Sequence, residues 1–147
     1  MIQVKASVHI RRSPEEVFAY LSNFENNPKW QSGMVSARFT SPGPLRVGST
    51  YSQEARFIGR PVLSEFDVIK YEPGRRVKIT SSSGTFPITV TRFVEPDGDD
   101  DGGTRVSAIV EGDASGVYRL AEPLLRSIVQ RSVQGDYERL KRVLEGG

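Results

Sequence analysis

A single long amphipathic helical pattern at the C-terminal end of the chain constrains the fold more than any other feature of the sequence. Apolar residues recur there at the spacing of one helix face: Leu120, Leu124, Leu125, Ile128, Val129, Val133, Leu140, Val143 and Leu144. Gly116 precedes this pattern and Gly146 follows it, and Pro123 fits only its first turn or a short preceding turn. We therefore predict one helix of more than about twenty residues, which is long for a chain of 147 residues.

The residues before this helix show the two-residue alternation of β-strands. From Ile2 to Ile10 every second side chain is apolar, which predicts a strand with one buried face. Between Val35 and Asp113, alternation and Gly/Pro turns predict about five or six further strands, and their short connections favour antiparallel neighbours. The strand predicted over Val62–Tyr71 carries apolar side chains on both faces, so the sequence leaves its inward face open.

Two short helices are predicted after the first strand. Ser13 is suited to the N-cap, Pro14 to the first helical position and Glu16 to a capping box. Because Pro28 cannot lie inside this helix, we expect the helix to end near residues 25–27. A second short helix is predicted to carry the next large apolar side chains, Trp30 and Met34.

These elements together predict an α+β fold, with residues 1–147 forming a single domain. A curved antiparallel sheet has to cover its apolar face, and only the C-terminal helix is long enough to do so. A strongly bent sheet around one helix leaves an internal cavity, and small apolar ligands bind in such spaces.

Composition excludes several function classes. The chain has no Cys and one His, so thiolate zinc sites, iron–sulfur clusters, cysteine nucleophiles and His-rich metal sites are not expected. The net charge is +2 and the basic residues are scattered, so nucleic acid is not an expected partner. No dinucleotide or phosphate-binding motif is present, and we expect no cofactor. No apolar run approaches the ~20 residues that cross a bilayer and no signal peptide is recognised, so we expect a cytoplasmic protein without a membrane span.

Six short motifs occur in order along nearly the whole chain: Ser13–Phe18, Asn27–Trp30, Val47–Thr50, Val68–Pro73, Gly103–Val106 and Leu140–Glu145. Together they resemble the START-like superfamily (SRPBCC), in its polyketide cyclase/dehydrase branch. The resemblance implies a helix-grip fold, in which the curved sheet wraps around the long C-terminal helix. It does not imply one function, because the superfamily includes lipid and sterol carriers, ubiquinone-binding proteins, aromatase/cyclases and chaperone partners.

The candidate ligand-binding residues are aromatic and apolar side chains, together with the polar side chain of Gln53. Buried Tyr and Trp side chains need partners for their polar tips. A ligand or an ordered water in a cavity would supply them; alternatively, the tips reach the surface or a backbone carbonyl. The predicted set is Trp30, Tyr51, Gln53, Phe57, Phe66, Ile79, Ile88, Tyr118, Leu124 and Ile128.

Glu65 and Tyr51 are the candidates for proton transfer. Glu65 and Asp67 lie two residues apart and project from one face of a strand. If that face lines the cavity, burial and mutual repulsion raise at least one of the two pKa values. We favour the outer face for both carboxylates, since this places Phe66 and Val68 inward.

Three further polar features are expected to be structural. His9 is expected to face solvent. Asp97–Gly102 matches the first half of a calcium loop, but the twelfth position is Ala108 instead of Glu, so we expect an acidic hairpin loop and no metal site. Arg131 lies near the apolar stripe of the last helix, and we expect it to point outward.

We predict that the chain binds a small, largely hydrophobic molecule (lipid-, aromatic- or polyketide-like) in the cavity, as a monomer or homodimer. The first alternative is an enzyme of the polyketide cyclase, aromatase or dehydrase type that uses the same cavity, with Tyr51 or Glu65 moving protons. The second alternative is a module that docks a protein partner through its outer sheet face or acidic loop. The sequence shows no convincing buried acid–base pair, which favours binding over catalysis.

Overall fold

A seven-stranded antiparallel sheet and three α-helices form the described part of the chain. The computed structural model describes residues 2–57, 59–83, 87–98, 102–112 and 121–146. The strands are β1 (Ile2–Ile10), β2 (Met34–Phe39), β3 (Thr50–Phe57), β4 (Arg60–Glu72), β5 (Arg76–Ser83), β6 (Ile88–Pro96) and β7 (Thr104–Gly112). The helices are α1 (Pro14–Ser22), α2 (Asn27–Trp30) and α3 (Glu122–Gly146), with one 3₁₀ turn, η1 (Phe24–Asn26).

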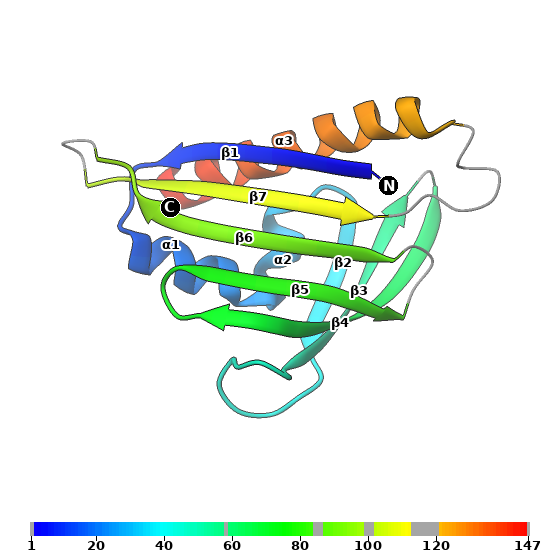
Figure 1. Ribbon diagram of the computed structural model, residues 1–147, viewed down its shortest axis with the longest axis horizontal. Coiled ribbons are helices and arrows are strands. Elements are labelled where there is room, and N and C mark those ends of the chain that lie inside the picture. Colours follow the sequence, from blue (N-terminus) through cyan, green and yellow to red (C-terminus); the bar gives the residue numbers. More distant parts are fainter. Residues whose placement is uncertain (1, 58, 84–86, 99–101, 113–120, 147) are drawn as a thin grey trace.

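The sheet is strongly curled and encloses the helices on one side. Its strand order is β1-β7-β6-β5-β4-β3-β2, and every neighbouring pair is antiparallel. The register shifts between β2 and β3 and twice between β4 and β5, and such bulges increase local twist and bend a sheet. In Figure 1, α1 and α2 lie behind the sheet and α3 runs along β1. This is the predicted helix-grip arrangement, a half-barrel with a long C-terminal helix.

Burial along the strands identifies the inward face of the sheet. In β1 the alternate side chains from Val4 to Ile10 are buried, as the alternation predicts. In β4, Phe66 and Val68 are buried and Glu65 is exposed. The face of β4 that carries Phe66 and Val68 is therefore the inward one, which the sequence alone does not determine.

The first helix begins as predicted but ends earlier. Ser13 Oγ accepts the backbone N–H of Glu16 at 3.2 Å, and Pro14 occupies the first turn. The helix stops at Ser22, because the side chain of Asn23 accepts the N–H of Glu25 at 3.3 Å and begins the 3₁₀ turn η1.

The second short helix carries Trp30 but not Met34, which begins β2. Gly33 separates the two elements with a positive φ of +76°, a conformation that disfavours side chains other than glycine. A Cβ at Gly33 would lie 2.7 Å from the carbonyl oxygen of Arg56, so the close approach of this turn to β3 also requires glycine.

Helix α3 covers the free edge of the sheet at β1. It is 25 residues long, in agreement with the prediction. Its side chains donate hydrogen bonds to carbonyl oxygens at alternate positions of β1: Gln130 Nε2 to Lys5 O at 2.7 Å, Gln134 Nε2 to Ser7 O at 3.2 Å and Lys141 Nζ to His9 O at 2.7 Å. A covered edge strand cannot pair with another chain, so this docking protects the fold from aggregation.

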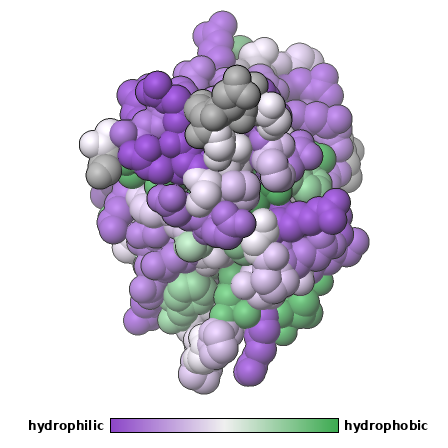
Figure 2. All heavy atoms as spheres, turned by 90° about the vertical axis from the view of Figure 1, so that its left-hand side faces the viewer, coloured by the Kyte–Doolittle hydropathy of each residue, from purple (hydrophilic) through white to green (hydrophobic). Residues whose placement is uncertain are grey.

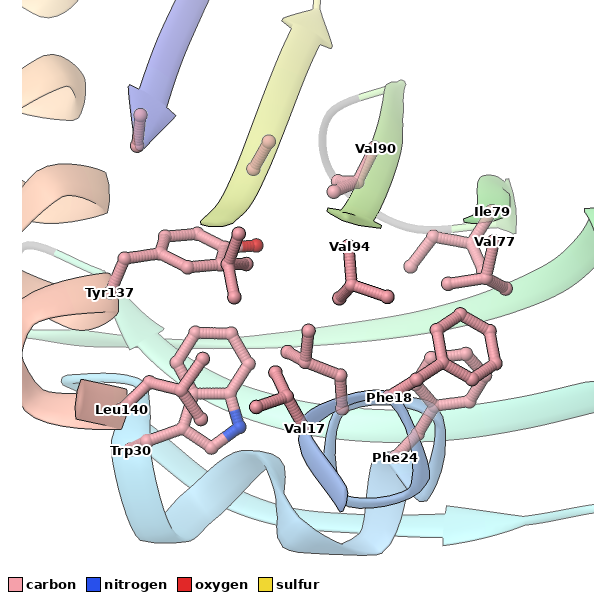
Figure 3. Packing of buried hydrophobic residues seen from close by; sticks show 14 of the residues in the cluster. Val17, Phe18, Phe24, Trp30, Val77, Ile79, Val90, Val94, Tyr137 and Leu140 are labelled. Atoms are coloured by element: carbon pink, nitrogen blue, oxygen red, sulfur yellow. The ribbon is translucent and has the colours of Figure 1, made fainter. Parts of the chain in front are cut away.

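The hydrophobic core lies between the C-terminal half of α3, the short helices and the inward face of the sheet. Figure 3 shows Tyr137 and Leu140 extending from α3 and Trp30 from α2 toward the valines of β6. Tyr137 and Leu140 are the side chains of α3 that are fully buried among the described residues.

Candidate functional site

A cavity of about 120 Å³ lies between the sheet and α3. Five strands, α2 and α3 contribute to its wall, which is mainly apolar. The lining residues are Trp30, Gln31, Tyr51, Gln53, Phe66, Ile79, Ile88, Val90, Arg92, Val110, Val133, Asp136 and Tyr137.

The cavity brings together six of the ten predicted ligand-binding residues: Trp30, Tyr51, Gln53, Phe66, Ile79 and Ile88. Leu124 and Ile128 do not belong to it, because they are 64% and 43% exposed on the N-terminal half of α3. Tyr118 lies outside the described residues. Phe57 is the last residue of β3, and its side chain is also outside the described part of the structure. Of the two proton-transfer candidates, Tyr51 lines the cavity and Glu65 is exposed, as the favoured interpretation of its strand expects.

Stacked aromatic rings form the rigid part of the wall. The ring of Tyr51 lies between Phe24 and Phe66, at centroid distances of 4.3 and 5.1 Å. The rings of Trp30 and Tyr137 meet edge to face at 5.0 Å. Such pairs contribute about 0.5–1.5 kcal/mol each beyond their buried area, so this wall is held in place without a ligand.

Arg92 places a buried positive charge in the wall. Its exposed fraction is 5%, and its Nε donates a hydrogen bond to Tyr137 Oη at 3.0 Å. The guanidinium lies 5.1 Å from the centroid of Trp30 and 5.9 Å from that of Phe24. No carboxylate of the described residues forms an ion pair with it. Burying an unpaired ion costs several kcal/mol, and a desolvated cation–π contact returns about 2 kcal/mol.

Asp136 is the acidic group of the cavity wall. Its Oδ1 accepts the backbone N–H of Ser32 at 2.9 Å, and Arg139 Nη1 lies 4.0 Å away. Burial raises the pKa of the Asp136 carboxyl above its usual value, although the Ser32 hydrogen bond and the charges of Arg139 and Arg92 act in the opposite direction. A carboxylate with a raised pKa in a cavity is able to act as a general base.

Several polar atoms of this region lack a partner among the described residues: Asn27 Oδ1, Trp30 Nε1, Tyr51 Oη and Arg92 Nη1. Buried polar atoms in folded proteins nearly always have a protein or water partner. Burial also raises the pKa of the Tyr51 and Tyr137 hydroxyls, so both stay protonated at neutral pH and serve as hydrogen-bond donors. The cavity therefore offers donors to an oxygen-bearing group.

Seven of the thirteen lining residues are absent from the predicted set: Gln31, Val90, Arg92, Val110, Val133, Asp136 and Tyr137. Arg92, Asp136 and Tyr137 matter most for the chemistry of the site. Each has a signal in the sequence. Arg92 occupies the inward position between Val90 and Val94 in β6. Tyr137 follows Val133 by one helical turn on the buried face of α3, and Asp136 precedes it.

The outer polar features have structural partners. His9 is half-buried instead of solvent-facing, because its Nδ1 pairs with Asp97 Oδ2. Arg105 also donates to both oxygens of Asp97, at 3.2 Å each. The hydrogen bonds from His9 and then Arg105 lower the pKa of Asp97. No cluster of three His, Cys, Asp or Glu side chains is found among the described residues, and positions 99–101 of the acidic loop lie outside them. Arg131 is exposed, as expected.

A second hollow of about 540 Å³ lies on the surface between α1 and the end of α3. Its lining combines charged, polar and apolar side chains: Arg12, Glu16, Ala19, Tyr20, Asn26, Val143 and Leu144. Figure 2 shows the end of the molecule at the left of Figure 1, where hydrophilic side chains cover most of the upper half and apolar ones gather below. The second hollow lacks the buried guanidinium and the stacked aromatic wall of the inner cavity, so we place the candidate site in the inner cavity.

The family model described as "Polyketide cyclase / dehydrase and lipid transport" matches residues 1–145. No curated protein matches the chain significantly. No helix in the described ranges is both long and apolar enough to cross a membrane.

Solved structures with the same fold are distant in sequence. The protein TTHA0849 from Thermus thermophilus superposes with a TM-score of 0.82 at 19% identity, over 95% of this chain and 94% of its own. A START superfamily protein from Mycobacterium smegmatis has a TM-score of 0.81 at 13% identity, over 99% of both chains. The di-domain ARO/CYC StfQ of the steffimycin biosynthetic pathway has a TM-score of 0.79 at 11% identity, over 99% of this chain and 51% of its own. At these identities the likeness describes the fold alone.

Proposed function

The chain belongs to the polyketide cyclase/dehydrase and lipid transport family, and from this premise we propose that it binds a small, largely hydrophobic molecule in the cavity between the sheet and α3. The observation that carries the proposal is a cavity whose mainly apolar wall contains hydroxyl, indole and guanidinium donors without partners among the described residues. Apolar surface supplies affinity at about 25 cal/mol per Å², and a few polar groups fix the orientation of the ligand.

The size of the cavity limits the ligand. An engineered apolar cavity of about 150 Å³ binds benzene, and the cavity here measures about 120 Å³. In this conformation the site takes a body of about one aromatic ring. A multi-ring polyketide or a lipid chain would enter only if α3 moved away from the sheet.

An enzyme of the cyclase, aromatase or dehydrase type is the second candidate function, and Asp136 is the observation that favours it. Asp136 lies in the cavity wall with a raised pKa, whereas Glu65 is exposed. Under this proposal the Asp136 carboxylate accepts a proton from a carbon next to a carbonyl group. The hydroxyl of Tyr51 remains protonated and donates a hydrogen bond to the carbonyl oxygen as it gains negative charge.

The binding proposal is tested by following the fluorescence of Trp30, which is the single tryptophan of the chain and lines the cavity. The ligand probe is p-cresol, one apolar ring with one hydroxyl. We expect a saturable change in Trp30 fluorescence. Val133→Phe, which extends a cavity-lining side chain of α3, should weaken binding at least tenfold. Ile128→Phe on the exposed part of the same helix should leave binding unchanged.

Two results would contradict the binding proposal. The first is a fluorescence titration of the wild-type protein that shows no saturation. The second is equal weakening of binding by Val133→Phe and Ile128→Phe, which would mean that p-cresol binds elsewhere.

A further inference from the structure

We propose that the molecule bound in this cavity is an anion of about the size of one aromatic ring, and that its carboxylate group contacts the guanidinium of Arg92. This inference rests on the proposed binding function and specifies the chemical class of the ligand. The charges of the cavity wall indicate the carboxylate, and the cavity volume of about 120 Å³ indicates the size of the body.

Arg92 carries a buried positive charge. Its side chain is 5% exposed, and a guanidinium group carries a positive charge. Among the described residues, no Asp or Glu forms an ion pair with the guanidinium. The faces of Trp30 and Phe24 lie nearby, and aromatic faces only partly compensate a buried cation. The cavity therefore has a positive charge that an anionic ligand would neutralise.

Unused hydrogen-bond donors lie in the same wall as this charge. Arg92 Nε donates a hydrogen bond to Tyr137 Oη at 3.0 Å, which fixes the orientation of the guanidinium. Arg92 Nη1 has no partner among the described residues. Tyr51 Oη is also without a partner there and belongs to the same wall. A carboxylate has two oxygens that accept hydrogen bonds, so it can use the guanidinium and a hydroxyl together. An amide or an alcohol of the same size lacks the charge.

The same wall also contains an acidic group, Asp136. The Oδ1 of Asp136 accepts the backbone N–H of Ser32 at 2.9 Å, and its ion-pair partner is Arg139 Nη1, 4.0 Å away, and not Arg92. Asp136 lies at the start of the buried stretch of α3, next to Tyr137. Arg92 therefore stabilises the Asp136 carboxylate at a distance and remains available to a second anion.

The experiment compares p-toluate with p-toluamide, which have nearly the same shape and differ in charge. Both are titrated into the wild-type protein at pH 7, with Trp30 fluorescence as the readout. We expect p-toluate to bind at least tenfold more tightly. Arg92→Met should abolish this preference while p-toluamide still binds. Arg131→Met removes an exposed arginine from α3 and serves as the matched control, which should keep the preference.

Equal or tighter binding of p-toluamide to the wild-type protein overturns the inference, and this comparison does not depend on whether Arg92→Met folds. If p-cresol and p-toluamide bind but p-toluate has no advantage, the anion inference fails and the binding function stands. If none of the three probes binds, the proposed function itself fails. Loss of the preference in Arg131→Met as well would show that it arises from the overall charge of the protein and would also overturn the inference.

Discussion

One methylene group added at Val90 should stabilise the protein, whereas the same change at Val94 should destabilise it. Both valines point inward from β6, with exposed fractions of 8% and 2%. Val90 lines the cavity and Val94 does not. Val90→Leu therefore extends into empty space, and Val94→Leu extends into filled core. The pair tests whether the cavity exists in solution.

The expected magnitudes follow from the cavity volume. At about 24 cal/mol per Å³, a void of about 120 Å³ corresponds to about 3 kcal/mol of lost packing free energy. One buried methylene recovers about 0.8 kcal/mol. We therefore expect Val90→Leu to raise the free energy of unfolding by about 0.5–1 kcal/mol. Overpacking at Val94 should lower it by about 1–3 kcal/mol.

The assay is equilibrium unfolding in urea, in which a shifted midpoint with an unchanged slope reports a change in stability alone. A gain of about 1 kcal/mol corresponds to a rise of about 2–4 °C in Tm for a chain of this size. If Val90→Leu loses as much stability as Val94→Leu, the cavity is closed in solution and the argument for a ligand site fails. If Val90→Leu is stabilised but binds p-cresol unchanged, the space exists and the ligand lies elsewhere.

Three further predictions concern two carboxyl groups and one helix cap. The pKa of Asp136 is raised in the folded state, so its ionisation lowers the stability of the fold as pH rises. In thermal melts, Asp136→Asn should therefore be more stable than the wild-type protein at pH 7. The difference should vanish below about pH 4, where the carboxyl group is protonated in both the folded and the unfolded state. Burial alone would raise the pKa of Glu145, but hydrogen bonds from Lys141 and the Arg11 backbone lower it to about 2. Glu145 therefore stabilises the fold above its unfolded pKa, and this contribution is lost as pH falls toward 2; Glu145→Gln should lower Tm at pH 7 but not at pH 2. Ser13→Ala removes the N-cap of α1 and should cost about 1 kcal/mol in urea unfolding, with Ser13→Thr as the control that retains the cap.

The strands and the long helix follow from local periodicity, and this is why the sequence predicts them well. The alternation in β1 needs no tertiary information, since one side of the strand is apolar and the other polar. The strand β4 differs because both faces carry apolar side chains. Only its pairing with β3 and β5, together with the bulges near Phe66 and Val68, determines which face is buried.

The apolar stripe of α3 shows where periodicity misleads. Leu124 and Ile128 continue the helical pattern, which predicts that they line the cavity, yet both are exposed. The pattern indicates one side of a helix but not how far along its length a partner extends. The hydrogen bonds of Gln130 and Gln134 to β1 place the helix along the edge of the sheet, and no local signal predicts that docking.

Arg92 explains why the chemistry of the site is harder to predict than its apolar wall. The inward positions of β6 hold Ile88, Val90 and Val94, and Arg92 interrupts this apolar pattern. Local periodicity does not predict what an arginine does at such a position. Its role depends on the curl of the sheet, which places the guanidinium beside Trp30 and Tyr137 from two different helices. A leucine would fill this inward position without the cost of burying a charge. Stability of the core therefore does not account for an arginine here, whereas the anion binding that we propose does.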